Sequence, residues 1–126
     1  MYEEVPYTEQ SMAALKARWN GYMDKLWALL PPDGAIIVAT VPPTTRTQCF
    51  DDWINEFNKE IPAAVARYQA AGRKSELAPT NQMISDSTPE RGLCSDKVHL
   101  SAQGYTAMAK AYYQAFKKVY PNTIGR

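Results

Sequence analysis

His99 is the only histidine of the chain, and Asp96 precedes it by three residues. A carboxylate beside an imidazole can orient the ring and stabilise the imidazolium that forms when the ring takes a proton from a hydroxyl group. The residue types alone are a weak signal, because a single histidine is more often a structural residue than a catalyst. The pair, however, ends a long polar stretch just before a helix, and catalytic groups concentrate on such loops. The position of the pair therefore fits a base with its orienting carboxylate.

No serine in the chain is a convincing nucleophile for this pair. Ser85 and Ser87 flank Asp86 in a polar stretch, without the strand-to-helix turn that exposes an attacking hydroxyl group. A metal site is not expected either, because one histidine and one aspartate do not bind a metal ion without further ligands. The chemistry that the pair suggests needs no cofactor.

Three helices and two strands are predicted along the chain, in an order typical of α/β proteins. The helices are expected over Glu9 to Leu30, from about Phe50 to Gly72, and from Ser101 to about Val119, and the strands over Ala35 to Val41 and Lys74 to Ala78. Ser101 is a suitable N-cap for the last helix, since its hydroxyl group can accept a hydrogen bond from the first turn.

Apolar residues at three- and four-residue steps mark the side of each helix that should turn inward. In the first helix these residues are Met12, Leu15, Trp19, Met23, Leu26 and Leu30. In the last helix they are Tyr105, Met108, Ala109, Tyr112, Phe116 and Val119. The three tryptophans, Trp19, Trp27 and Trp53, fall in helical patterns, and we expect core or interface positions for them.

Two segments carry residues that interrupt regular structure. Pro62 falls inside the second helical pattern, where proline removes a backbone donor and crowds the preceding turn. Either the helix kinks there or its main body begins just before Pro62, and we favour the second alternative. The polar segment from Pro79 to Lys97 is predicted to be a long loop, and such loops in compact domains are usually functional or disordered.

The strand expected over Ala35 to Val41 is nearly continuous in its apolar character. This composition is typical of a strand buried on both faces inside a parallel sheet, with neighbours on both edges. The chain offers only one other strand. We therefore expect either a dimer formed through an exposed sheet edge or a parent protein with further strands before Met1.

Composition indicates one domain and excludes several kinds of partner. The chain has 126 residues, of which 45% are hydrophobic and 21% charged, as in ordinary globular domains. Fourteen basic and thirteen acidic residues nearly cancel, so no concentrated basic surface predicts binding to nucleic acid or to an anionic membrane. The longest apolar run is too short for a transmembrane helix.

The segment around the histidine resembles a known enzyme family. Asp96-x-x-His99 followed by Leu100, Ser101, Gly104 and Tyr105 is similar to the last block of the SGNH (GDSL) hydrolases, in which Asp and His stand three apart before the C-terminal helix. The strand from Ala35 to Val41 with Pro42-Pro43, and the segment from Phe57 to Ile61, resemble that family's fourth strand and the following helix. The resemblance covers nearly the whole chain, but only the last block is specific.

The resemblance implies an esterase or lipase that cleaves acyl esters with a Ser-His-Asp triad. His99 would be its base, Asp96 its orienter, and residues 1–126 would be the C-terminal half of a flavodoxin-like three-layer α/β/α sandwich with a parallel sheet. The family's blocks with the nucleophilic Ser and the oxyanion-hole Gly and Asn have no match in the chain, and they would precede Met1. We therefore expect the isolated chain to be inactive, because removing a triad nucleophile costs on the order of a million-fold in turnover.

Cys49 follows the first predicted strand, and Cys94 precedes the last predicted helix. In a parallel sheet both positions lie at the rim formed by the carboxyl ends of the strands, so a disulfide between them is geometrically allowed. We favour this disulfide over two reduced thiols. Because disulfides persist in oxidising compartments, the bridge would indicate a secreted or extracytoplasmic parent, for which a carbohydrate or lipid ester is a fitting substrate.

A function of another class also fits the chain. A non-catalytic module could use its unpaired sheet edge to bind a second copy or a polypeptide that carries the missing half, since strand addition at an open edge is a known mode of recognition. Such binding would also cover the apolar surface that the chain must otherwise expose.

Overall fold

The computed structural model describes residues 7–44, 48–87, 92–94 and 96–122, and of residues 48–50 it describes the backbone only. Its elements are α1 (Glu9–Leu29), β1 (Ala35–Ala39), α2 (Gln48–Ala70), β2 (Lys74–Ala78), α3 (Thr80–Ser85) and α4 (Ala102–Val119). The predicted α/β class is confirmed, and so are the three predicted helices and both strands. The short helix α3 was not predicted, because its six residues lie in the polar segment that was expected to be a loop.

The sheet has two strands, which pair in parallel with Ile36 opposite Ser75 and Ala39 opposite Ala78. The expectation that β1 is buried on both faces is wrong: only Val38 is buried, and the rest of the strand is half-buried. The reason is that β1 has a partner strand on one edge only within the described part of the chain.

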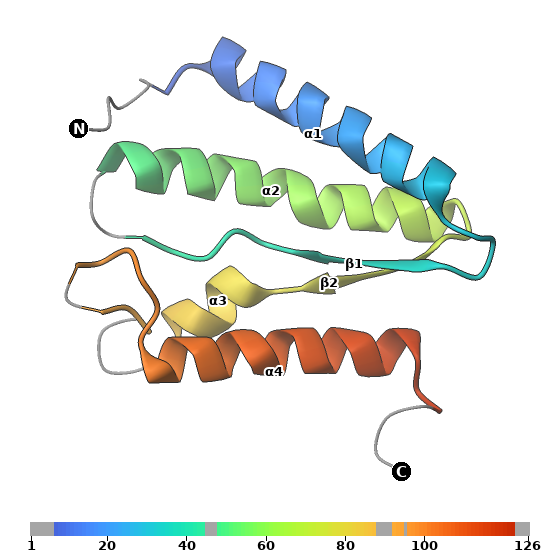
Figure 1. Ribbon diagram of the computed structural model, residues 1–126. Helices are drawn as coiled ribbons and strands as arrows, with labels where there is room; N and C mark the ends of the chain where they lie inside the picture. The colour runs from blue at the N-terminus through green and yellow to red at the C-terminus, as the bar shows by residue number, and fades with distance from the viewer. Residues whose placement is uncertain (1–6, 45–47, 88–91, 95, 123–126) are drawn as a thin grey trace.

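Helices cover both faces of this sheet (Figure 1). α1 and α2 lie on one face, where buried side chains form the larger core. This core contains Met12, Met23, Val38, Phe57, Ile61, Ala64, Val65 and Tyr68, and all three tryptophans pack against it as expected. On the other face α4 packs against the strands through Ala78, Ala111 and Ala115, with α3 beside it.

Helix α2 continues through Pro62, so the expectation that its main body begins just before this residue is wrong. Proline removes one backbone hydrogen bond from a helix interior. The apolar face around it, with Ile61 2% and Val65 4% exposed, packs into the larger core and offsets that loss.

The inward face of α4 also differs from the prediction. The buried residues are the small ones, Gly104, Ala107, Ala111 and Ala115, together with Val119. Tyr105, Tyr112 and Phe116 were expected to face inward but are 54%, 42% and 41% exposed. Small side chains let the helix backbone approach the sheet closely, and the aromatic stripe is thereby turned to the side. In α1, similarly, Leu26 is 49% exposed.

Candidate functional site

Asp96 and His99 lie in a short hairpin that precedes α4. Leu93 and Leu100 form an antiparallel bridge, the Cys94 amide donates to the His99 carbonyl oxygen at 2.7 Å, and the Ser101 amide donates to Gly92 O at 2.8 Å. The chain reverses with Lys97 in the left-handed region at φ 63°, which is uncommon for a residue other than glycine. These contacts bring the predicted pair together on a defined backbone.

The carboxylate of Asp96 is hydrogen-bonded through both oxygens. Oδ2 lies 2.5 Å from His99 Nδ1, and Oδ1 accepts hydrogen bonds of 3.0 Å from the amides of Val98 and His99. The hydrogen bond from His99, followed by those from the two amides, holds the pKa of Asp96 well below its ordinary value. Asp96 is therefore an anion at neutral pH, and it fixes Nδ1 of the imidazole as the nitrogen that faces the carboxylate.

The other ring nitrogen of His99 faces outward. The side chain of His99 is 76% exposed and that of Asp96 is 47% exposed. Within the described residues, no hydrogen bond is made to His99 Nε2. An imidazole held at Nδ1 by a carboxylate and open at Nε2 can accept a proton from a hydroxyl group presented to it.

The hairpin is seated on the first turn of α4 by two glycines. Gly92 has φ of 70°, and a Cβ built at Gly104 would come within 2.0 Å of Gly92 O. The Ser101 hydroxyl accepts a hydrogen bond from the Gly104 amide, which confirms the predicted N-cap. The position of the hairpin thus depends on the absence of a side chain at residue 104.

The hairpin and the carboxyl end of β1 lie at the same end of the molecule (Figure 1). Thr44, which is 8% exposed, donates its hydroxyl hydrogen to the carbonyl oxygen of Lys97 at 2.8 Å. The segment between β1 and Thr44 is fixed in turn by Asn58, whose side chain accepts from the Val41 amide at 2.8 Å and donates to Val41 O at 3.0 Å. Sequence analysis did not foresee these contacts, because they join residues far apart in the chain.

Among the described residues, no hydrogen bond joins a serine hydroxyl group to His99. Ser87 donates its hydroxyl hydrogen to Met83 O at 3.1 Å, and Ser101 serves as the cap of α4. Ser85 is the last residue of α3. The described residues therefore supply a base with its orienter and no attacking group.

Cys94 is an exposed, free thiol, and its Sγ lies 3.3 Å from the carbonyl oxygen of Leu100. The side chain of Cys49 lies outside the described residues. The structure thus gives no support to the predicted Cys49–Cys94 disulfide, which stays a prediction. Mass spectrometry after denaturing alkylation without reductant tests this disulfide. Two added alkyl groups would show that both thiols are free, and an unchanged mass would support the disulfide.

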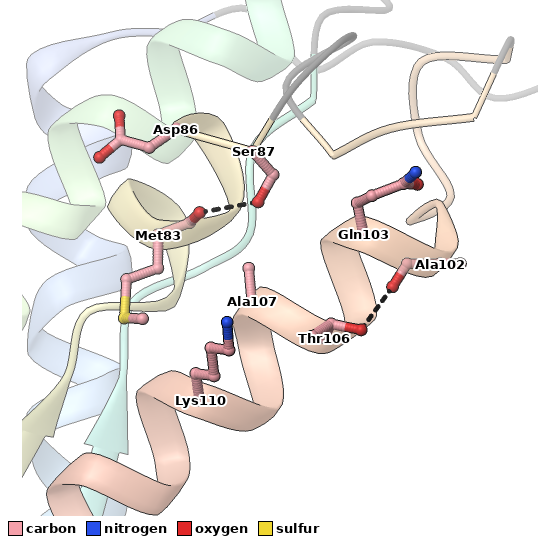
Figure 2. A pocket seen from close by; sticks show the side chains of 8 residues that line it. All are labelled: Met83, Asp86, Ser87, Ala102, Gln103, Thr106, Ala107 and Lys110. Atoms are coloured by element: carbon pink, nitrogen blue, oxygen red, sulfur yellow. Dashed lines mark hydrogen bonds between the residues drawn. The ribbon is translucent and has the colours of Figure 1, made fainter.

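A pocket of about 590 Å³ lies between α3 and α4 (Figure 2). Its lining comprises Met83, Asp86, Ser87, Ala102, Gln103, Thr106, Ala107 and Lys110. Neither Asp96 nor His99 lines it, although Ala102 and Gln103 follow the pair closely in the chain. Sequence analysis missed this pocket because it requires α3.

Two features are absent from the described residues. No group of three or more His, Cys, Asp or Glu side chains is arranged to hold a metal ion. None of the described helices combines the length and the apolar character needed to cross a membrane.

Comparisons with family models, with curated proteins and with solved structures give no match to this chain.

Proposed function

We propose that this chain supplies the base and the orienting carboxylate of a Ser-His-Asp ester hydrolase of the SGNH type. The observation that carries the proposal is the short contact between Asp96 Oδ2 and His99 Nδ1, at 2.5 Å, with the opposite side of the ring exposed. In the working enzyme, His99 would take the proton of a serine hydroxyl group as it attacks an acyl ester and return it to the leaving alcohol. Asp96 would hold the imidazole and stabilise its charged form.

The serine would come from a segment outside this chain. Two features of the described residues support this part of the proposal: no serine hydroxyl group is hydrogen-bonded to His99, and β1 pairs with another strand on one edge only. The sheet of such a parent protein would be larger, as in a flavodoxin-like three-layer sandwich. A small-molecule, carbohydrate or lipid acyl ester is the proposed substrate, and an extracytoplasmic location is proposed together with the disulfide.

The first test is hydrolysis of p-nitrophenyl acetate by the purified chain. We expect no activity above that of the His99→Ala variant, because the nucleophile is missing. Hydrolysis by the 126-residue chain that is abolished by His99→Ala would overturn the proposed incompleteness.

The second test uses the longer product of the coding locus, if its upstream sequence encodes an in-frame strand followed by Gly-Asp-Ser. In that protein His99→Ala should lower kcat on the order of a million-fold and Asp96→Asn about ten-thousand-fold, as in serine proteases. Asp86→Asn is the matched control, since Asp86 is an exposed carboxylate bonded only to the neighbouring Gln82 in the described structure. Equal activity of Asp96→Asn and Asp86→Asn would contradict the triad.

A second candidate function is a module that binds a further strand, and the open edge of β1 favours it. The Thr40 amide donates to Ala78 O, and the Ser75 hydroxyl donates to Ile36 O, so the even-numbered residues of β1 direct their backbone groups at β2. Because these groups alternate along a strand, Ile37 and Ala39 direct theirs at the opposite edge.

The composition of the two strands also differs in a way that bears on this edge. β1 reads Ala-Ile-Ile-Val-Ala, without charge or proline, whereas β2 carries Lys74 and Glu76. Natural edge strands are commonly protected by charges, prolines or bulges. β2 therefore has the character of an edge strand and β1 that of a central strand, which fits strand addition by a second copy or by a polypeptide with the missing half.

Proline substitution tests the module at this edge. Ala39→Pro removes an N–H at the open edge and leaves the ladder with β2 in place, whereas Val38→Pro, the control, removes an N–H that faces β2. We expect Ala39→Pro to keep the circular dichroism of the wild type and to lose any self-association seen by light scattering. If the wild-type chain stays monomeric at high concentration, a second copy is excluded as the partner of this edge. If Ala39→Pro associates as the wild type does, the edge of β1 is excluded as the surface of association.

A further inference from the structure

The peptide group between Lys97 and Val98 connects the loop after β1 to the catalytic pair. Its carbonyl oxygen accepts the hydroxyl hydrogen of Thr44 at 2.8 Å. Its N–H, which belongs to Val98, donates to Asp96 Oδ1 at 3.0 Å. One peptide plane is thus held from both sides, by Thr44 at the oxygen and by Asp96 at the nitrogen.

This arrangement has consequences for Asp96. A hydrogen bond to the oxygen of an amide polarises the group and strengthens the bond that its N–H donates. The same hydrogen bond also opposes rotation of the peptide, and rotation would take the N–H away from Oδ1. The left-handed conformation of Lys97, at φ 63°, is unfavourable for a residue with a side chain and persists only where its surroundings hold it.

Thr44 is itself held firmly enough to act in this way. It is 8% exposed, and it follows a segment whose Val41 backbone is bonded on both polar groups by the side chain of Asn58 in α2. Asn81 donates a further hydrogen bond of 3.0 Å to Val41 O. Through its hydroxyl group, Thr44 thus anchors the exposed turn of the hairpin to the sheet and to α2.

We infer that Thr44 is a positioning residue for the Asp96–His99 pair: through the Lys97–Val98 peptide it orients Asp96, and Asp96 then fixes the tautomer of His99. The inference rests on the proposed function for its importance. The test of this positioning role does not measure hydrolysis. A negative result therefore leaves the proposed hydrolase function open, and an inactive protein leaves the positioning role open.

The experiment uses the fact that His99 is the only histidine. In the chain labelled with ¹⁵N-histidine, nuclear magnetic resonance gives one pair of ring-nitrogen signals, which report the tautomer when the imidazole is neutral. In the wild type we expect well separated signals, with the proton on Nδ1 and Nε2 unprotonated. In Thr44→Val, which keeps the shape and loses the hydroxyl group, the two signals should move toward each other as the tautomers mix.

Thr44→Ser keeps the hydroxyl group and should restore the wild-type separation. Thr106→Val is the matched control, because the Thr106 hydroxyl also donates to a backbone carbonyl, that of Ala102 in α4, without contacting the pair. Thr106→Val should leave the signals unchanged.

A folded Thr44→Val chain with wild-type ring signals would overturn the inference, and so would a wild type without a preferred tautomer. Thr44→Ala is a second variant for the case that valine prevents folding. If neither variant folds while Thr44→Ser does, the inference is also overturned, because Thr44 would then support the fold rather than orient the pair.

Discussion

The face of the sheet covered by α1 and α2 and the face covered by α4 are packed with side chains of very different size. On the first, large apolar residues such as Phe57, Ile61 and Tyr68 fill the space between two helices and the strands. On the second, Ala111 and Ala115 of α4 meet Ala78 of β2. The first face gains its stability from the area that large side chains bury. The second face brings the backbone of α4 close to the sheet. This close packing fixes the position of the hairpin that carries Asp96 and His99.

The two kinds of packing respond differently to substitution. Removing atoms from the first face leaves a cavity, whereas adding atoms to the second produces a collision. Ile61→Ala tests the first response and Gly104→Ala the second.

Ile61→Ala should have the largest effect, because Ile61 is 2% exposed at the centre of the larger core. Truncating a buried isoleucine to alanine costs about 2–5 kcal/mol in the free energy of unfolding. Urea denaturation followed by tryptophan fluorescence measures it. Leu29→Ala is the control, since Leu29 is 82% exposed, and equal losses for the two variants would contradict the assignment of the core.

Gly104→Ala tests the close contact on the α4 side. The new Cβ would lie 2.0 Å from Gly92 O, so backbone must shift, at a cost of about 1–3 kcal/mol in unfolding free energy. The hairpin should move with it, and the His99 ring-nitrogen signals should change. Gly21→Ala is the matched control: nothing lies within 4 Å of the added Cβ in α1, and stability should rise by about 1 kcal/mol. Stability gained at both positions would refute the close contact.

Tyr68→Phe probes a polar atom inside the larger core. The Tyr68 hydroxyl group is buried and has no hydrogen-bond partner in the described structure, and burial raises the pKa of Tyr68. Removing an unsatisfied hydroxyl group relieves a desolvation cost, so the variant should be as stable as the wild type or up to about 1 kcal/mol more stable. Tyr22→Phe, at a 65% exposed position, should be neutral. A clearly lower Tm for Tyr68→Phe than for the wild type would show that the hydroxyl group has a hydrogen-bond partner.

Asp96→Asn should have the smallest effect on stability, because the pair is exposed, and it should depend on pH. The folded state lowers the pKa of Asp96 below its unfolded value, chiefly through His99. The stabilisation that ionised Asp96 gives the folded state is therefore fully present above the pKa of Asp96 in the unfolded chain, about 4. It is lost as pH falls below that pKa toward the lower pKa of the folded state. The difference in Tm between wild type and Asp96→Asn should shrink from pH 6 to pH 2. A difference that grows toward low pH would contradict this.

The sequence indicated much of the local structure. Asp96 and His99 stand three apart with an N-cap after them, and so short a spacing puts the carboxylate within reach of the imidazole and of the amides of Val98 and His99. The strand from Lys74 to Ala78 and the Ser101 cap were predicted for the same reason, since both depend on neighbouring residues. The esterase function is a prediction from resemblance and stays one.

Only the tertiary structure decided which side of α4 faces the sheet. The helix carries a stripe of small residues and a stripe of aromatic residues, and periodicity alone favours the larger, more apolar one. Close packing against the sheet selected the small stripe. The passage of α2 through Pro62 was likewise settled by packing, because the apolar face of that helix outweighs one lost hydrogen bond. The contact of Thr44 with Lys97 joins residues 53 positions apart, and no local pattern encodes such a contact.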